Sequence, residues 1–291
     1  MRFTYAEAMT DPTFYKPLAQ AAEAAGFDGF LVPDSICYPF ESDAKYPYTP
    51  DGSREFIEDK AFLEPFSMIP YLGAVTERIR FVVSVLKLTV RHPVLVAKQA
   101  ASTAVLTDDR LTLGIGTSPW PEDYEVCDVP FARRGKRADE SLDVISGLLT
   151  GDWFEYHGEI YDVPKIKQCP VPAQPLPILV GGHAEPALRR AAQRGDGWIH
   201  GGGDHEALPG LITRVLELRA EAGRAADPFE VHVISMDAYT VDGIRRLEEM
   251  GVTDVIVGFR WTYEVAQDTE TLQRKIDNLQ RYADTVIAAS R

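Results

Sequence analysis

The sequence is poor in cysteine and in basic residues, and it has no long hydrophobic run. Its three cysteines, Cys37, Cys127 and Cys169, stand far apart without a C-x-x-C pair, which argues against a disulfide framework and a zinc site. Because the net charge is -14, we expect neither nucleic acid nor an anionic membrane as a partner. The longest apolar stretch, 81–90, is too short to cross a membrane, and the N-terminus lacks the apolar run of a signal peptide. These absences predict a cytoplasmic protein.

The order of apolar and helical patterns predicts the fold class. With 291 residues, 45% of them hydrophobic, the chain can bury a large core, and no shift in composition marks a domain boundary. Strands are expected at 3–9, 27–32, 79–88, 110–116, 178–180, 198–200, 229–239 and 252–259. Helices are expected at 13–25, 62–76, 94–106, 133–149, 183–194, 206–222, 242–250 and 271–288.

Strict alternation of strand and helix predicts an α/β fold, a parallel (β/α)8 TIM barrel that spans residues 1–291 as a single domain. A doubly wound open sheet is the structural alternative. Insertion loops are expected at the C-terminal face, where active sites of such barrels lie. Segment 36–60 has no clear period, and its length is typical of a lid or binding loop, although a solvated surface insertion is the alternative. We expect this segment and the turn 117–129 to shape a pocket for a small-molecule substrate, and 153–163 to form a hairpin.

Two adjacent glycines follow a short apolar strand and precede a helix. The strand 178–180 stops at Gly181 and Gly182, and the helical pattern begins directly after them. Free N–H groups in the first helical turn, together with the positive end of the helix dipole, are typical of a site that binds phosphate without a lysine. A tight turn without a ligand is the alternative, because the segment matches neither G-x-G-x-x-G nor the P-loop.

Three stretches, in order, resemble the luciferase-like family of flavin-dependent oxidoreductases, and particularly its branch that uses the deazaflavin coenzyme F420. They are residues 76–116, 129–163 and 177–199. The resemblance implies the same barrel fold and a homodimer. It also implies a bulge with a non-proline cis peptide at the end of the third strand, which presses on one face of the cofactor ring; the matching pair here is Ser84–Val85.

The resemblance also implies where the cofactor binds. The phosphate cradle of the family falls on Gly181, Gly182 and His183. The full set of expected cofactor-binding residues is Ser84, Val85, Thr117, Gly181, Gly182, His183 and His200. On the helix after the glycines, Arg189 or Arg190 is a candidate for assisting the phosphate, and a solvated helix face is the alternative.

Four groups near the predicted strand ends are candidates for handling a proton. They are Asp34, His92, Glu122 and His200, and each has a purely structural polar role as its alternative. We expect Asp34 to be catalytic, because the aromatic residues of segment 36–60 would desolvate its carboxyl group and favour the protonated form. Luciferases proper place a histidine where this chain has Asp34-Ser35, which disfavours oxygen chemistry of the bacterial-luciferase type.

The sequence therefore predicts an F420-dependent oxidoreductase that transfers a hydride between the deazaflavin and a small organic substrate. A monooxygenase of the same fold that uses reduced FMN and O2 is the alternative. A metal-dependent barrel hydrolase is disfavoured, because the chain has neither His-x-His at the end of the first strand nor H-E-x-x-H, and we expect no metal ligand. A cofactor-free binding protein is the remaining alternative.

Overall fold

Eight parallel strands form the centre of the molecule. The computed structural model describes residues 1–49 and 51–291, and the strands close into a barrel in the order β1-β10-β9-β8-β7-β4-β3-β2. Their bounds are β1 (Arg2–Ala6), β2 (Gly29–Val32), β3 (Arg80–Lys87), β4 (Leu111–Gly116), β7 (Ile178–Gly181), β8 (Gly197–Ile199), β9 (Glu230–Val233) and β10 (Asp254–Val257). The predicted (β/α)8 barrel is confirmed.

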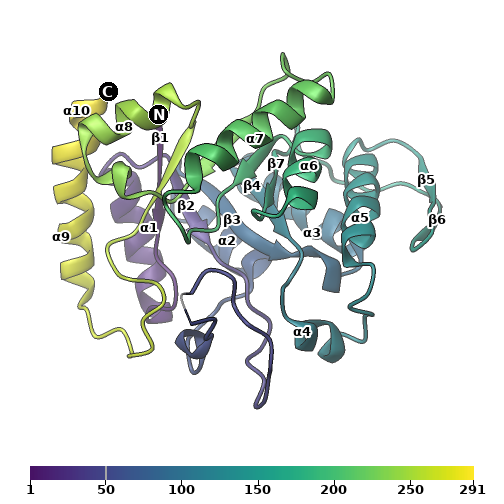
Figure 1. Ribbon diagram of the computed structural model, residues 1–291, viewed down its shortest axis with the longest axis horizontal. Helices are drawn as coiled ribbons and strands as arrows, with labels where there is room; N and C mark the ends of the chain where they lie inside the picture. The colour runs from purple at the N-terminus through teal and green to yellow at the C-terminus, as the bar shows by residue number, and fades with distance from the viewer. Residues whose placement is uncertain (50) are drawn as a thin grey trace.

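Helices cover the outside of the barrel (Figure 1). They are α1 (Tyr15–Ala24), α2 (Pro65–Gly73), α3 (Pro93–Leu106), α5 (Arg134–Leu149), α6 (Glu185–Arg194), α7 (Leu208–Glu221), α8 (Val241–Glu249), α9 (Leu272–Tyr282) and α10 (Ala288–Ser290). The predicted hairpin is formed by β5 (Phe154–His157) and β6 (Asp162–Ile166), which pair antiparallel. No helix in the described ranges is long and apolar enough to cross a membrane.

Two local predictions are wrong. The strand expected to reach residue 239 ends at Val233, and a short 3-10 helix covers Met236–Tyr239. That helix begins where the Ser235 side chain accepts a hydrogen bond from the Asp237 amide, which replaces the ladder pattern of a strand. The expected turn 117–129 contains a helix, α4 (Pro121–Val126), which has proline at its start and acidic residues in its first turn.

Side chains inside the barrel form a separate apolar layer. Because successive residues of a strand face opposite sides, alternate residues point either to the helices or to the interior. The interior layer consists of Leu31, Val82, Leu179, Ile199 and Ile256, each at most 7% exposed. Ala6, Val85 and Ile234 pack against this layer. It separates the polar amino end of the barrel from the carboxyl end.

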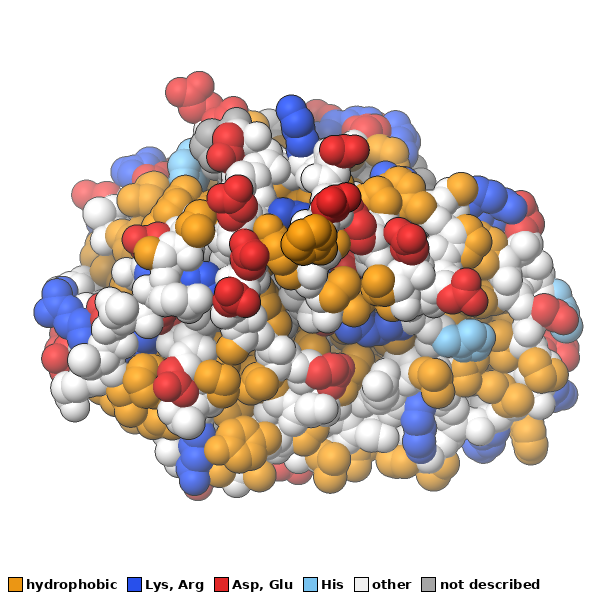
Figure 2. All heavy atoms as spheres, turned by 90° about the horizontal axis from the view of Figure 1, so that it is seen from below, with side chains coloured by type: hydrophobic (Ala, Val, Ile, Leu, Met, Phe, Trp, Pro, Cys, Tyr) orange, Lys and Arg blue, Asp and Glu red, His pale blue; other side chains and the backbone are white. Residues whose placement is uncertain are grey.

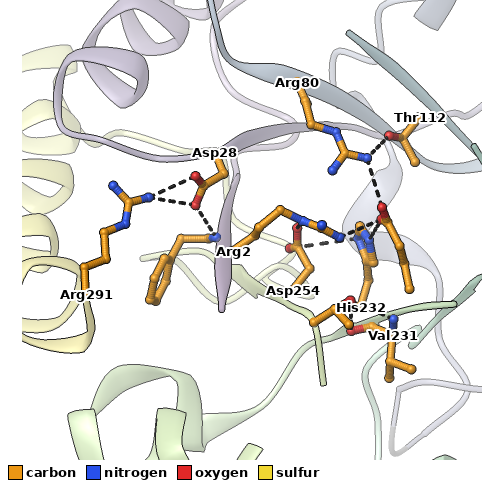
Figure 3. Close-up of polar contacts among 11 residues, drawn as sticks. Arg2, Asp28, Arg80, Thr112, Val231, His232, Asp254 and Arg291 are labelled. Atoms are coloured by element: carbon orange, nitrogen blue, oxygen red, sulfur yellow. Dashed lines mark hydrogen bonds and ion pairs between the residues drawn. The ribbon is translucent and has the colours of Figure 1, made fainter. Parts of the chain in front are cut away.

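Ion pairs fill the amino end (Figure 3). Glu230 contacts Arg2 at 2.8 Å and Arg80 at 3.4 Å, and its carboxylate lies 2.6 Å from His232 Nε2. Burial opposes ionisation of Glu230, but the hydrogen bond from His232 and the charges of the two arginines outweigh it and lower the pKa of Glu230 to about 2. These pairs stabilise the amino end of the barrel, so the carboxyl end remains as the place for a ligand.

Candidate functional site

Long segments that follow β2, β4 and β10 meet at the carboxyl end of the barrel, which we call the mouth. Segment 36–60, which we call the lid, contains few regular elements, with a 3-10 helix at Glu55–Ile57. Seen from this side in Figure 2, acidic side chains gather across the middle of the face. The lid carries six exposed acidic residues: Glu41, Asp43, Asp51, Glu55, Glu58 and Asp59.

Five aromatic side chains hold the lid over the mouth. We call them the aromatic cluster: Tyr46, Tyr48, Phe56, Trp120 and Tyr263. Tyr46 is central, because its ring stacks on Trp120 with centroids 5.4 Å apart and also contacts the other three. The cluster therefore joins the lid to the segments that follow β4 and β10.

The predicted phosphate cradle lies where β7 meets α6. The strand ends at Gly181 and α6 begins at Glu185, and no side chain caps this N-terminus in the described part of the chain. Gly182 has a φ of +116°, which favours glycine. A Cβ atom at Gly181 would lie 2.8 Å from Val85 Cγ1. The two glycines thus leave the main chain open beside the first N–H groups of a helix, which is the arrangement that binds anions.

His183 and His200 stack directly above this turn, with ring centroids 4.6 Å apart and planes 11° apart. His183 Nε2 accepts a hydrogen bond from the Gly201 amide at 3.1 Å. His200 Nδ1 lies 3.1 Å from the Ile234 carbonyl oxygen, so Nδ1 carries the proton and Nε2 is an acceptor. That Nε2 is buried and has no hydrogen-bond partner among the described residues.

Both histidines are neutral at physiological pH. Burial lowers the pKa of His183. Burial and the neighbouring His183 together lower the pKa of His200 to about 3. The pair therefore presents a buried, uncharged acceptor on His200, which is suited to a ligand that donates a hydrogen bond.

The end of β3 has the irregular geometry that the resemblance implies. The Ser84–Val85 peptide bond is cis, and the register between β3 and β4 shifts between Val83 and Leu86. The Val85 side chain occupies space left by glycines on the neighbouring strands. A Cβ atom would lie 2.7 Å from Val85 at Gly116 and 2.8 Å from it at Gly181. The small residues of β4 and β7 thus make room for this bulge.

Asp34 is part of an ion pair. Its Oδ2 accepts a hydrogen bond from the Lys87 amide at 2.8 Å and lies 2.8 Å from Arg91 NH1, while Arg91 NH2 donates to its Oδ1 at 2.9 Å. The Asp34 side chain is only 1% exposed, but Arg91 contacts both of its oxygens and Phe40 of the lid is 99% exposed, so Phe40 does not cover this carboxylate. Asp34 joins the ends of β2 and β3.

A second set of polar contacts at the mouth, around Lys87, was not predicted from the sequence. Lys87 Nζ lies 2.7 Å from Asp123 on α4, and the Ser118 hydroxyl donates to the same carboxylate. Arg54 of the lid lies 3.4 Å from Glu122 and 4.3 Å from the centre of the Trp120 ring. The sequence contained one sign of such a pair, because Lys87 lies in a predicted buried strand and a buried lysine requires a partner for its charge.

The remaining candidates have structural partners. His92 caps α3, where its Nδ1 accepts a hydrogen bond from the Val94 amide. Arg189 contacts Glu185 at 2.7 Å and Arg190 contacts Asp139 at 2.7 Å, so the expectation that either arginine assists a phosphate is not supported by their contacts. Thr117 lies half-buried directly after β4. Within residues 1–49 and 51–291, no three His, Cys, Asp or Glu side chains are arranged to hold a metal ion.

Comparisons with known proteins agree with this architecture. A family model described as luciferase-like monooxygenase matches residues 4–276. An uncharacterized protein of Mycobacterium tuberculosis is 64% identical over 288 residues, which cover 99% of each chain. An F420-dependent glucose-6-phosphate dehydrogenase of Nakamurella multipartita is 29% identical over 254 residues, 82% of this chain and 67% of that protein. The structure of a coenzyme F420-dependent tetrahydromethanopterin reductase from Methanopyrus kandleri shares the fold, with a TM-score of 0.74, 15% identity and coverage of 100% of this chain and 99% of that one.

Proposed function

Because this chain belongs to the luciferase-like monooxygenase family, we propose that it is an oxidoreductase that uses coenzyme F420 to exchange a hydride with a small organic substrate. The F420 dependence of the Nakamurella multipartita relative supports the choice of cofactor. We further propose that the protein acts in the cytoplasm as a homodimer, with residues 1–291 as one domain.

The observation that carries this proposal is the open turn before α6. The main chain at Gly181, Gly182 and His183 lies beside a helix N-terminus that lacks a side-chain cap. Glu185, in the first turn, is neutralised by Arg214 at 2.8 Å and by Arg189 at 2.7 Å, so its charge does not exclude an anion. These residues fit the phosphate end of either flavin-type cofactor.

The other expected residues have roles at the ring end. In this proposal Val85 supports one face of the ring, and Ser84 and Thr117 contact its edge from the ends of β3 and β4. His200 Nε2 accepts a hydrogen bond from a bound hydroxyl group, because it is buried without a partner. When bound, the deazaflavin supplies two-electron hydride exchange, and the protein holds ring and substrate in contact.

Asp34 remains the proposed catalytic carboxylate, with its role defined by its contacts. It holds the Lys87 amide while Arg91 donates to the Lys87 carbonyl oxygen at 2.9 Å, so Asp34 and Arg91 together fix the main chain two residues beyond Val85. Loss of this carboxylate would displace the support for the cofactor ring.

A monooxygenase that uses reduced FMN and O2 is the second candidate, because the matching family model carries the description of a monooxygenase. Both cofactors carry a phosphate group on the side chain of the ring and would use the same cradle. A fluorescence titration of the purified protein with F420 and with FMN tests the choice. We expect saturable quenching with F420 at concentrations at which FMN does not bind; tighter binding of reduced FMN would instead favour the monooxygenase.

A further inference from the structure

We propose that the substrate of this site is an uncharged molecule with an apolar or aromatic ring and a hydroxyl group, and that anionic substrates are excluded. This inference rests on the proposed function, since it concerns the substrate of the same mouth. It is carried by the pairing of the cations there, by the neutral histidines and by the aromatic cluster.

Four cations at the mouth each contact a carboxylate, and Lys45 of the lid is instead exposed to solvent. The pairs are Lys87–Asp123 at 2.7 Å, Arg91–Asp34 at 2.8 Å, Arg54–Glu122 at 3.4 Å and Arg260–Asp268 at 3.7 Å. Lys60 of the lid donates instead to the carbonyl oxygens of Val265 and Ala266. An anionic substrate that takes its counter-charge from one of the four paired cations therefore has to break an existing pair, which leaves a carboxylate without its partner.

The histidines do not supply a positive charge either. The rings of His183 and His200 stack with centroids 4.6 Å apart, and protonating either imidazole is unfavourable because His200 is buried and His183 is partly buried. They can exchange hydrogen bonds with an uncharged group. The unpartnered Nε2 of His200, whose residue is 1% exposed, accepts from a hydroxyl group.

The remaining surroundings are apolar. Val85 and Ile234 pack against the interior layer of the barrel, and Tyr48 covers the histidine pair from the lid, with its ring centroid 4.9 Å from that of His183. A ligand that reaches His200 takes the place of this phenol ring. A ring-shaped apolar ligand restores the contacts that Tyr48 gives up, whereas a small ion does not.

Exposed acidic residues on the lid act in the same direction. Glu55 and Glu58 are exposed, acidic side chains gather across the middle of the face in Figure 2, and the chain carries a net charge of -14. Such a field lowers the local concentration of anions and so slows their approach. The phosphate of a cofactor is handled differently, because main-chain amides at the α6 N-terminus bind it.

Benzyl alcohol and benzoate form a matched pair of probes, because they share a ring and differ in charge. Their dissociation constants are measured by ligand-observed NMR on the full chain in phosphate buffer, which occupies the main-chain anion site. We expect benzyl alcohol to bind at least about tenfold more tightly than benzoate. Equal or tighter binding of benzoate, or no binding of either probe, would overturn the inference.

A variant that removes the carboxylate partner of one cation tests whether the paired cations cause the selectivity against anions. Glu122→Gln removes the partner of Arg54, so we expect benzoate affinity to rise about tenfold while benzyl alcohol affinity stays unchanged. Glu125→Gln, an exposed position on the same helix, is the matched control and should change neither value. If both variants leave benzoate binding unchanged, paired cations are not the reason for selectivity and the inference fails. Because these titrations need no turnover, a failure of F420 to bind would contradict the proposed function without altering their result.

Discussion

His200 combines burial, neutrality and an unused acceptor in one side chain. Its pKa in the folded protein is about 3, below the ordinary value near 6.5, because burial and His183 oppose the charged form. The unfolded chain therefore binds a proton on this residue below about pH 6.5 that the folded chain does not. The stability contributed by this histidine is present above pH 6.5 and is lost as the pH falls toward 3.

This predicts a measurable pH dependence of unfolding. Between pH 6.5 and 4, the free energy of unfolding should fall less steeply in His200→Phe than in wild type. The difference between the two slopes should be at most about 1.4 kcal/mol per pH unit. Urea titrations at several pH values provide the measurement. His157→Asn is the control, because His157 is exposed and its pKa is raised by Asp162, so its removal cannot flatten the decline. Parallel curves for wild type and His200→Phe would refute a neutral His200.

Asp34→Asn tests the carboxylate at the end of β2. We expect turnover to fall about tenfold or more, because Arg91 loses a charged partner and the main chain near Val85 loses a restraint. Cofactor affinity should change little, since the proposed phosphate site lies at the end of β7, which β3 and β4 separate from β2. The measurements are kcat and cofactor titration, with the melting temperature as a check on folding. Wild-type turnover in this variant would remove Asp34 from the mechanism.

Single residues could be predicted from the sequence where backbone geometry decides their type. Gly181 and Gly182 were identified in this way, whereas the Ser84–Val85 pair was implied only by the family resemblance. The pairing of Lys87 with Asp123 could not be predicted, because it depends on how α4 docks against the end of β3. A carboxylate's partner is a property of tertiary structure, and for the same reason the Arg91 contact of Asp34 was missed.

At the scale of elements, the contact between the lid and the glycine run after β8 determines access to the site. A glycine run, Gly201 to Gly203, follows β8, and a Cβ atom at Gly201 would lie 2.8 Å from Tyr48 Cζ. The Tyr48 ring of the lid is thus the neighbour of Gly201. The glycine run serves as the surface on which the Tyr48 ring lies.

Gly201→Ala should therefore loosen the lid. The added methyl group displaces Tyr48, so we expect faster proteolysis within 36–60 and faster association of the cofactor, each by about threefold or more. Limited proteolysis and stopped-flow fluorescence measure these rates. Gly210→Ala on α7 is the control, because a Cβ atom there has no neighbour within 4 Å. Identical rates in the two variants would show that Tyr48 does not close the site.

Lys275 of α9 is the buried charge that holds the segment before that helix. Its Nζ lies 3.0 Å from Glu7, 2.8 Å from Asp268 and 3.5 Å from Glu270. Lys275→Met leaves these carboxylates without a counter-charge, so we expect a loss of about 3–5 kcal/mol in the free energy of unfolding. Arg274→Met, at a 60% exposed side chain of the same helix, should cost less than about 0.5 kcal/mol. Similar urea midpoints for both variants would contradict a buried ionic role for Lys275.

The order of strands and helices was predictable, because apolar runs and helical periods are local signals. Two predicted elements were wrong where a local feature of the sequence starts a helix. Ser235 ends β9 early by binding the Asp237 amide, and α4 begins at Pro121 within an expected turn. In both places a local hydrogen bond or a helix start competes with the hydrophobic pattern.

At the scale of the whole molecule, stabilising ion pairs lie at the amino end of the barrel and the candidate site lies at the carboxyl end. The ion-paired residues at the amino end are partly shown in Figure 3; they are Arg2, Arg80, Glu230, His232 and Asp254. The interior apolar layer lies between them and the carboxyl end. The carboxyl end combines a helix N-terminus, neutral histidines and a covering lid. Strand alternation predicted the barrel, but the closed lid depends on contacts between segments far apart in the chain, which sequence patterns do not report.

The most direct test of the account is a crystal structure of the protein soaked with F420. The account predicts that the phosphate lies within hydrogen-bond distance of the main-chain amides at Gly182 and His183, with Tyr48 displaced from the histidine pair. A phosphate bound elsewhere, with the turn between β7 and α6 empty, would contradict it.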